Sequence, residues 1–154
     1  MTMTAKTAEK TPEKTRRQRW MAILARASRA EIAELLGAEL PRHDILKAPE
    51  TGTVMVEGRA GGAGRRFNLG EATVTRCIVR LDDGAMGFSY ALGRDARKAR
   101  LAAILDARLQ AEAPDSALHR AVHDLAQRQS AARDLASRKA AATKVDFFTL
   151  VRGA

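Results

Sequence analysis

The chain has 154 residues, 45% of them apolar, which is a usual size for a single domain with its own core. Its formal charge of +9 favours an anionic partner, whether a nucleic acid, a phosphorylated metabolite or an acidic protein. The single cysteine excludes an internal disulfide, and no apolar stretch nears the roughly 18 residues that cross a bilayer, so we expect a soluble cytoplasmic protein.

The N-terminal part predicts a tail followed by two short helices. Residues 1–15 carry few large apolar groups and several lysines, so we expect a disordered basic tail. We expect residues 16–154 to form one domain. The second helix begins with a capping box from Ser28 to Glu31 and must end near Pro41. The first helix shows an apolar face at helical spacing: Trp20, Ile23, Leu24 and Ala27.

Three strands are predicted next, as a meander. Alternation of apolar and polar residues begins at Thr53 and predicts a strand through Glu57. A second strand is predicted over 72–81, with Cys77 as a small buried side chain. Asp83-Gly84 predicts a tight turn into a third strand. That strand carries four large side chains on one face: Met86, Phe88, Tyr90 and Leu92.

One face of the middle strand mixes apolar and charged side chains. Such a face is too apolar for free solution and too charged for a plain core, so we expect it to be partly covered. Its members are Val74, Arg76, Ile78 and Arg80.

Helices are predicted after the meander. Asp95 is placed to cap one helix and Asp115 to cap the next, which follows Pro114. Residues 126–144 favour a helix but offer little to bury, so this segment either frays or is held by a partner.

The segment 145–151 has large apolar groups on both faces of a predicted strand. Exposed, it would invite aggregation, so it either pairs with the meander as a fourth strand or docks on another subunit. Phe147, Phe148 and Leu150 are the candidate subunit contacts. The fold class expected is α+β, with a small, mainly antiparallel sheet (the meander plus the C-terminal strand) flanked by helices at both ends.

A loop rich in glycine and arginine follows the first predicted strand. Its glycines can turn backbone amides toward an anion, and arginines such as Arg59 and Arg76 can supply guanidinium forks to phosphate oxygens. The loop matches no standard phosphate fingerprint, since it has neither a Gly-Lys pair nor the third glycine of a dinucleotide turn. A flexible surface hairpin with solvated arginines is the alternative interpretation.

Other candidates are weaker. His119 and His123 have the spacing of a shared metal ligand pair, but Arg120 stands where a zinc protease helix needs glutamate, and we expect no metal. Glu50 and Glu71 are possible bases or ribose ligands, or else ion-pair partners. No nucleophile and base can be paired from the sequence, so a self-sufficient enzyme is not expected.

Several motifs together resemble a known family. They are Arg17-Gln18-Arg19-Trp20-Met21-Ala22, Pro49-Glu50-Thr51-Gly52, Gly58-Arg59-Ala60-Gly61-Gly62, Phe67-Asn68-Leu69-Gly70-Glu71, Thr73-Val74-Thr75-Arg76-Cys77 and residues 145–153. Over the chain from Arg16 onward, the sequence is similar to the G subunit of the bacterial carbon-phosphorus lyase system.

The resemblance implies a subunit of a complex with the H, I and J subunits, working with the L subunit. The implied reaction displaces adenine from ATP by a phosphonate such as methylphosphonate, giving a ribose 1-phosphonate 5-triphosphate. This chain would complete a site and be inactive alone, with no cofactor of its own. A polyanionic substrate suits the glycine and arginine loop. The candidates for phosphate or phosphonate contact are Arg59, Gly61, Gly62, Asn68, Glu71 and Arg76.

A nucleic-acid-binding module is the alternative function. It is motivated by the charge of +9 and by the lysines and arginines of the N-terminal tail. Against it, aromatic residues make up only 4% of the chain, and none are paired on strands to stack on bases.

Overall fold

The computed structural model describes residues 15–145. The chain divides into two compact units, Met1–Ala111 and Glu112–Ala154. None of the described helices combines the length and hydropathy needed to cross a bilayer. The elements of the first unit are α1 (Arg16–Arg26), α2 (Arg29–Leu36), β1 (His43–Arg59), the 3-10 turn η1 (Ala60–Gly62), β2 (Arg66–Leu81), β3 (Met86–Leu92) and α3 (Ala96–Ala111), and the second unit contains α4 (Ala117–Ala142).

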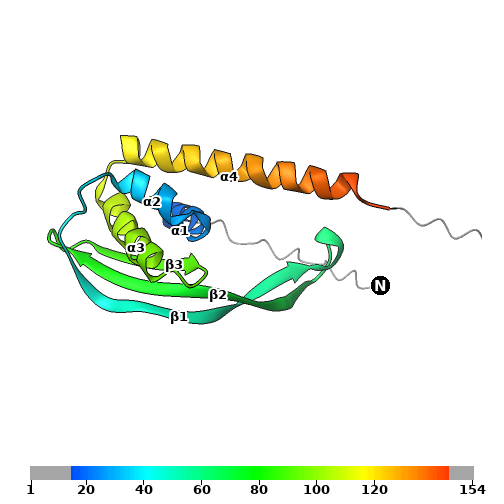
Figure 1. Ribbon diagram of the computed structural model, residues 1–154, viewed down its shortest axis with the longest axis horizontal. Coiled ribbons are helices and arrows are strands. Elements are labelled where there is room, and N and C mark those ends of the chain that lie inside the picture. The colour runs from blue at the N-terminus through cyan, green and yellow to red at the C-terminus, as the bar shows by residue number, and fades with distance from the viewer. Residues whose placement is uncertain (1–14, 146–154) are drawn as a thin grey trace, which may run out of the picture. The chain divides into compact units, whose positions relative to one another are not determined.

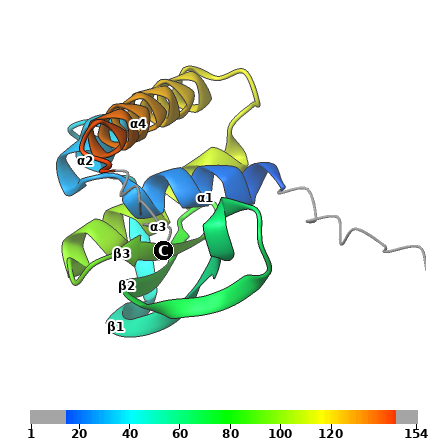
Figure 2. The same cartoon turned by 90° about the vertical axis from the view of Figure 1, so that its right-hand side faces the viewer.

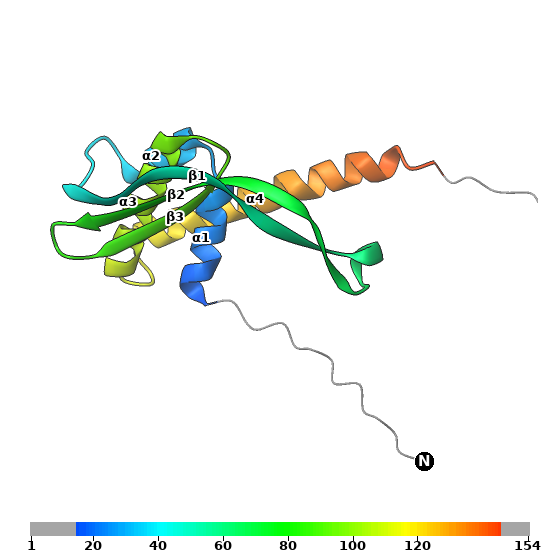
Figure 3. The ribbon, with the colours of Figure 1, turned by 90° about the horizontal axis from the view of Figure 1, so that it is seen from below.

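The expected α+β fold is confirmed. The strands form one antiparallel sheet in the order β1-β2-β3, with helices before and after it in the chain. Within the first unit, α1 and α3 lie on one face of this sheet, and α2 packs on α3 (Figures 1 and 2). The opposite face carries none of these three helices, and it is the face turned to the viewer in Figure 3. We call it the helix-free face, with reference to the helices of the first unit alone.

Local signals explain where the helices begin. The capping box at Ser28 is confirmed, because its hydroxyl accepts from the amide of Glu31 while the Glu31 carboxylate accepts from the amide of Ser28. The cap at Asp95 is confirmed by its hydrogen bond from the Lys98 amide. The cap at Asp115 was wrong: Ser116 caps α4 and accepts from the His119 amide.

The sheet packs on α3 through small side chains. On β3 the buried positions are Gly87, Ser89 and Ala91. A Cβ at Gly87 would collide with the carbonyl oxygen of Ala103, so α3 lies almost on the strand backbone there. Ser89 Oγ donates to the carbonyl oxygen of Ala99 at 2.7 Å. The large side chains of β3 therefore lie on the helix-free face, where Tyr90 is 50% exposed.

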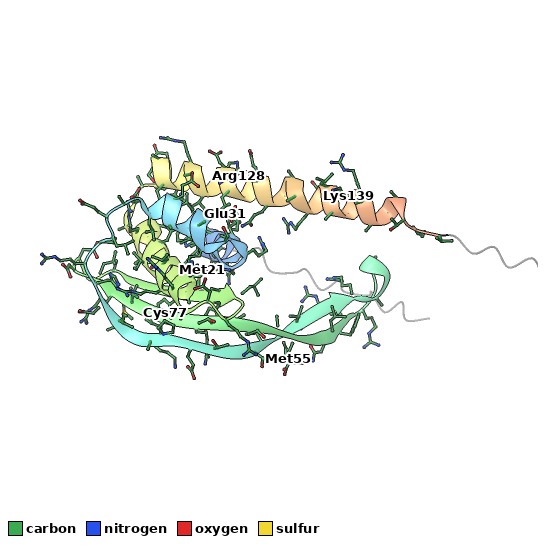
Figure 4. The ribbon with its side chains drawn as sticks, viewed as in Figure 1. Met21, Glu31, Met55, Cys77, Arg128 and Lys139 are labelled. Atoms are coloured by element: carbon green, nitrogen blue, oxygen red, sulfur yellow. The ribbon has the colours of Figure 1, made fainter. Side chains whose placement is uncertain are left out.

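The side chains on the helix-free face of β2 are buried to different extents along the strand. Val74 is buried, Arg76 and Ile78 are half-buried, and Arg80 is exposed, as a partly covered face requires. Cys77, expected to be buried, is 1% exposed on the opposite side of β2. Figure 4 marks it in the part of the strand beneath α3.

Both predicted strands before the tight turn are longer than the sequence indicated. β1 begins at His43 rather than Thr53, and β2 begins at Arg66 rather than Ala72. The first part of β1 lies at the sheet edge, carries Pro49 and contains two register irregularities, so its residues show no clean alternation. The start of β2 was missed because it contains glycine and polar residues, which are unusual in strands. An exposed two-stranded ribbon tolerates them.

Two predictions lie outside the described residues. These are the disordered tail, apart from Thr15, and the contacts proposed for Phe147, Phe148 and Leu150 on the C-terminal strand. The helix predicted over 126–144 is present, since α4 runs to Ala142, and every residue from 130 to 145 is exposed.

Candidate functional site

The glycine and arginine loop is a compact turn between paired strands. Arg59 on β1 is opposite Arg66 on β2, so the turn spans only residues 60–65. Gly61 and Gly62 adopt φ angles of 59° and 81°, which other residues rarely adopt. The Gly64 amide donates to the Ala60 carbonyl oxygen at 2.7 Å, and Arg59 Nη1 donates to the Gly64 carbonyl oxygen at 3.4 Å. Apart from half-buried Gly64, the turn and both arginines are exposed.

Arg76 belongs to a separate charged cluster. Its Nη2 lies 3.3 Å from Glu50 Oε2, and Lys47 Nζ lies 2.9 Å from the same oxygen. The hydrogen bond and charge of Lys47, followed by the charge of Arg76, hold the pKa of Glu50 below its ordinary value. A hollow of about 250 Å³ adjoins the cluster and is lined by Lys47, Arg76, Cys77, Ile78, Phe88, Ser89 and Tyr90.

The six candidate residues therefore do not form one site on this chain. Asn68 and Arg76 are eight residues apart on β2, about 26 Å at the rise of an extended strand. Glu71 and Arg76 also lie on opposite faces of the strand, because successive side chains alternate and the register between them is regular. Arg59, Gly61, Gly62 and Asn68 gather at the turn, Glu71 lies midway, and Arg76 stands beside Glu50.

His43 and His123 each hydrogen-bond to nearby protein groups. His43 Nδ1 lies 2.8 Å from the Pro41 carbonyl oxygen, and its Nε2 accepts from Arg100 Nε at 2.9 Å, which assigns the ring proton to Nδ1. His123 Nε2 lies 3.1 Å from Gln127 Nε2. Within residues 15–145 no three of the His, Cys, Asp and Glu side chains are grouped to hold a metal ion.

A buried carboxylate that the sequence analysis missed joins three elements. Asp106 of α3 is fully buried and accepts from the Arg17 guanidinium at 2.7 Å, from Trp20 Nε1 at 2.8 Å and from the Phe88 amide at 2.9 Å. The Arg17 guanidinium also lies 5.2 Å from the centre of the Phe88 ring. The sequence feature that could have revealed this residue is an aspartate within the mostly apolar run Leu101–Leu109, where a buried charge needs a partner.

Two further buried groups have shifted pKa values. Lys98 Nζ donates to the carbonyl oxygens of Ala25 and Leu92, each at 3.1 Å, and burial lowers its pKa. Burial raises the pKa of the Cys77 thiol, whose Sγ lies 3.4 Å from the Lys47 carbonyl oxygen. Cys77 is thus a protonated core side chain at neutral pH and has no thiolate for nucleophilic attack.

Comparisons with known proteins extend over nearly the whole chain. The family described as "Phosphonate metabolism protein PhnG" matches residues 15–153. A relative from Rhizobium meliloti (strain 1021), the alpha-D-ribose 1-methylphosphonate 5-triphosphate synthase subunit PhnG, is 47% identical over 144 residues. That alignment covers 89% of this chain and 89% of the relative.

Proposed function

This chain belongs to the PhnG family of phosphonate metabolism proteins, and from that membership we propose that it is a subunit of an alpha-D-ribose 1-methylphosphonate 5-triphosphate synthase. The observation that carries the proposal is the 47% identity over 89% of both chains. Such a subunit takes part in phosphonate catabolism within a multi-subunit enzyme. A cytoplasmic complex suits the single buried thiol, because that compartment is reducing.

The partners we propose are the H, I and J subunits of the carbon-phosphorus lyase pathway, with the L subunit acting in the same reaction. The complex uses ATP and a phosphonate as substrates, and this chain completes the assembly and its site and is inactive alone. The separation of the candidate residues along β2 supports a role that depends on other subunits. A substrate that touched both Asn68 and Arg76 would need neighbouring subunits to fill the about 26 Å between them.

We further propose that Arg59 and Arg76 bring positive charge to the phosphate or phosphonate groups. Gly61 and Gly62 shape the turn beside Arg59, and Asn68 and Glu71 offer polar groups further along the same ribbon. Arg76 is half-buried and already fixed by Glu50, so little side-chain entropy is lost when an anion joins the pair. Guanidinium groups match phosphate oxygens in shape and charge.

The test is reconstitution of adenine release from ATP and methylphosphonate by the purified subunits. We expect release to stop when this chain is omitted, and we expect the chain alone to release no adenine. Adding Arg76→Ala or Arg59→Ala should preserve assembly and lower the rate about tenfold to a hundredfold, the value of a lost charge-assisted hydrogen bond. Arg94→Ala is the matched control, since Arg94 is exposed and lies outside both clusters.

Two results would count against the proposal. Full activity without this chain would remove the subunit role, and unchanged rates in both arginine variants would confine that role to assembly.

A further inference from the structure

Beyond its third strand, the sheet continues as a two-stranded arm. We define the arm as residues 53–59 of β1, the turn 60–65 and residues 66–73 of β2. β3 pairs with β2 only as far as Val74, so neither strand of the arm has a third neighbour in the described sheet. Figure 3 shows the arm reaching well past β3 and α1. A lone two-stranded ribbon gains little stability by itself, so its exposed apolar groups need an explanation.

The arm is amphipathic. Paired residues share a face, and side chains alternate along each strand except at a register shift between Val56 and Glu57, where Leu69 has no partner on β1. A Cβ at Gly58 would lie 3.5 Å from Phe67 Cζ and 3.6 Å from Leu69 Cβ, which places both large side chains over that glycine. The apolar face comprises Val54, Val56, Gly58, Phe67, Leu69, Gly70 and Ala72. The opposite face comprises Thr53, Met55, Glu57, Arg59, Arg66, Asn68, Glu71 and Thr73.

The apolar face is open to solvent. Exposed fractions are 36% for Val54, 37% for Val56, 46% for Phe67 and 66% for Leu69. Four large apolar side chains at adjacent positions of one ribbon face form a continuous patch, and such patches mark interaction sites. A Cβ at Gly70 would meet nothing within 4 Å, so a partner can approach the backbone closely at that point of the patch.

Charge at the end of the arm selects the kind of partner. From residue 57 to 66 the arm carries Arg59, Arg65 and Arg66 against the single carboxylate of Glu57, which lies 3.8 Å from Arg66. A second copy of this chain would bring a like-charged tip and a like net charge of +9. A different protein with carboxylates at the matching place would gain from both the charge and the apolar contact.

We propose that the apolar face of this arm docks in an apolar groove, bordered by carboxylates at one end, on another subunit of the synthase. The proposal rests on the proposed function and names the surface through which the chain joins the complex. Leu69 and Phe67 are the central contacts, and Arg65 in the turn meets the acidic border.

The test compares two exposed residues on opposite faces of the arm. Leu69→Glu places a carboxylate on the apolar face, and Met55→Glu places the same group on the other face, where Met55 is 58% exposed. Figure 4 marks Met55 on the arm, nearer to its base than to its turn. The dissociation constant is measured for the full chain with the purified H, I and J subunits, each alone and in mixture. Circular dichroism and the melting temperature confirm that both variants fold.

We expect Leu69→Glu to weaken binding at least about tenfold, as loss of a central interface residue does, and Met55→Glu to change it less than about threefold. Arg65→Glu should weaken binding and make it less sensitive to salt, because the tip meets carboxylates. Equal binding by the unchanged chain and Leu69→Glu would overturn the docking surface while the subunit role stands. If the unchanged chain binds none of the three subunits, both ideas fail. Self-association abolished by Leu69→Glu would instead assign the surface to a second copy and overturn the proposal.

Discussion

At the scale of single residues, Asp106 organises the first unit. A carboxylate that is fully buried is tolerated only when hydrogen bonds replace its water, and Asp106 receives them from Arg17, Trp20 and the Phe88 amide. Because these donors come from α1 and β3 while Asp106 belongs to α3, one side chain determines how three elements meet. Arg17 is 37% exposed, so the indole and amide donors are the more thoroughly desolvated partners.

We expect Asp106→Ala to lower the free energy of unfolding by about 3 kcal/mol, since it leaves buried donors without an acceptor. Urea denaturation followed by tryptophan fluorescence measures this free energy, because Trp20 is the single tryptophan and is buried in the folded protein. Asp82→Ala, at an exposed turn position, is the control and should stay within about 0.5 kcal/mol of the unchanged protein. Equal stability of the two variants would show that the hydrogen bonds to Asp106 contribute little.

At the scale of elements, the contact between β3 and α3 decides which face of the sheet is buried. Gly87 brings the strand against the backbone of α3, and Ser89 and Ala91 continue the small face. The larger side chains of β3 are consequently displaced to the helix-free face, where Tyr90 lines the hollow beside Arg76. Close approach of the backbones thus outweighs the burial of larger side chains at this strand.

We predict that Gly87→Ala lowers the free energy of unfolding by at least about 1 to 3 kcal/mol, because the new methyl group collides with the Ala103 carbonyl and α3 must move. Gly52→Ala is the matched change, since a Cβ there would meet nothing within 4 Å and the residue also lies in a strand. Thermal unfolding of both variants gives the comparison. Similar melting temperatures for the two variants would mean that α3 can move away from the new methyl group with no loss of stability.

At the scale of the whole molecule, the chain has several surfaces whose features suit neighbours in a complex. The arm exposes apolar side chains, and all of residues 130–145 are exposed in and after α4. The following segment carries Phe147, Phe148 and Leu150, which the sequence analysis identified as candidate subunit contacts. Contacts through both the arm and the C-terminal segment would let one small chain meet two neighbours, or two places on one neighbour.

A chain that ends at Thr143 tests the second of these contacts separately from the arm. We expect it to keep the melting temperature of the first unit and to lose copurification with the other subunits, because the removed segment supplies Phe147, Phe148 and Leu150. A full-length chain with Phe147→Ser and Phe148→Ser should show the same loss. Undiminished copurification of the shortened chain would exclude the C-terminal segment as a docking element.

Local patterns in the sequence were enough for the fold class, the capping box at Ser28, the third strand and the burial of Cys77. These features depend on near neighbours in the chain: a hydroxyl three residues from an amide, or apolar residues two positions apart. The family resemblance likewise needed only residue identities, and the family match over residues 15–153 confirms it.

Only the tertiary structure decided the long edge strand β1, the exposed face of β3, the role of Asp106 and the distance between Arg76 and the turn. Each of these depends on residues far apart in sequence, such as Trp20 with Asp106 or Glu50 with Arg76. Alternation along a strand reveals two faces but not which one receives a helix. That choice follows from how closely two backbones can approach, which is why one glycine, Gly87, outweighs four large side chains on β3.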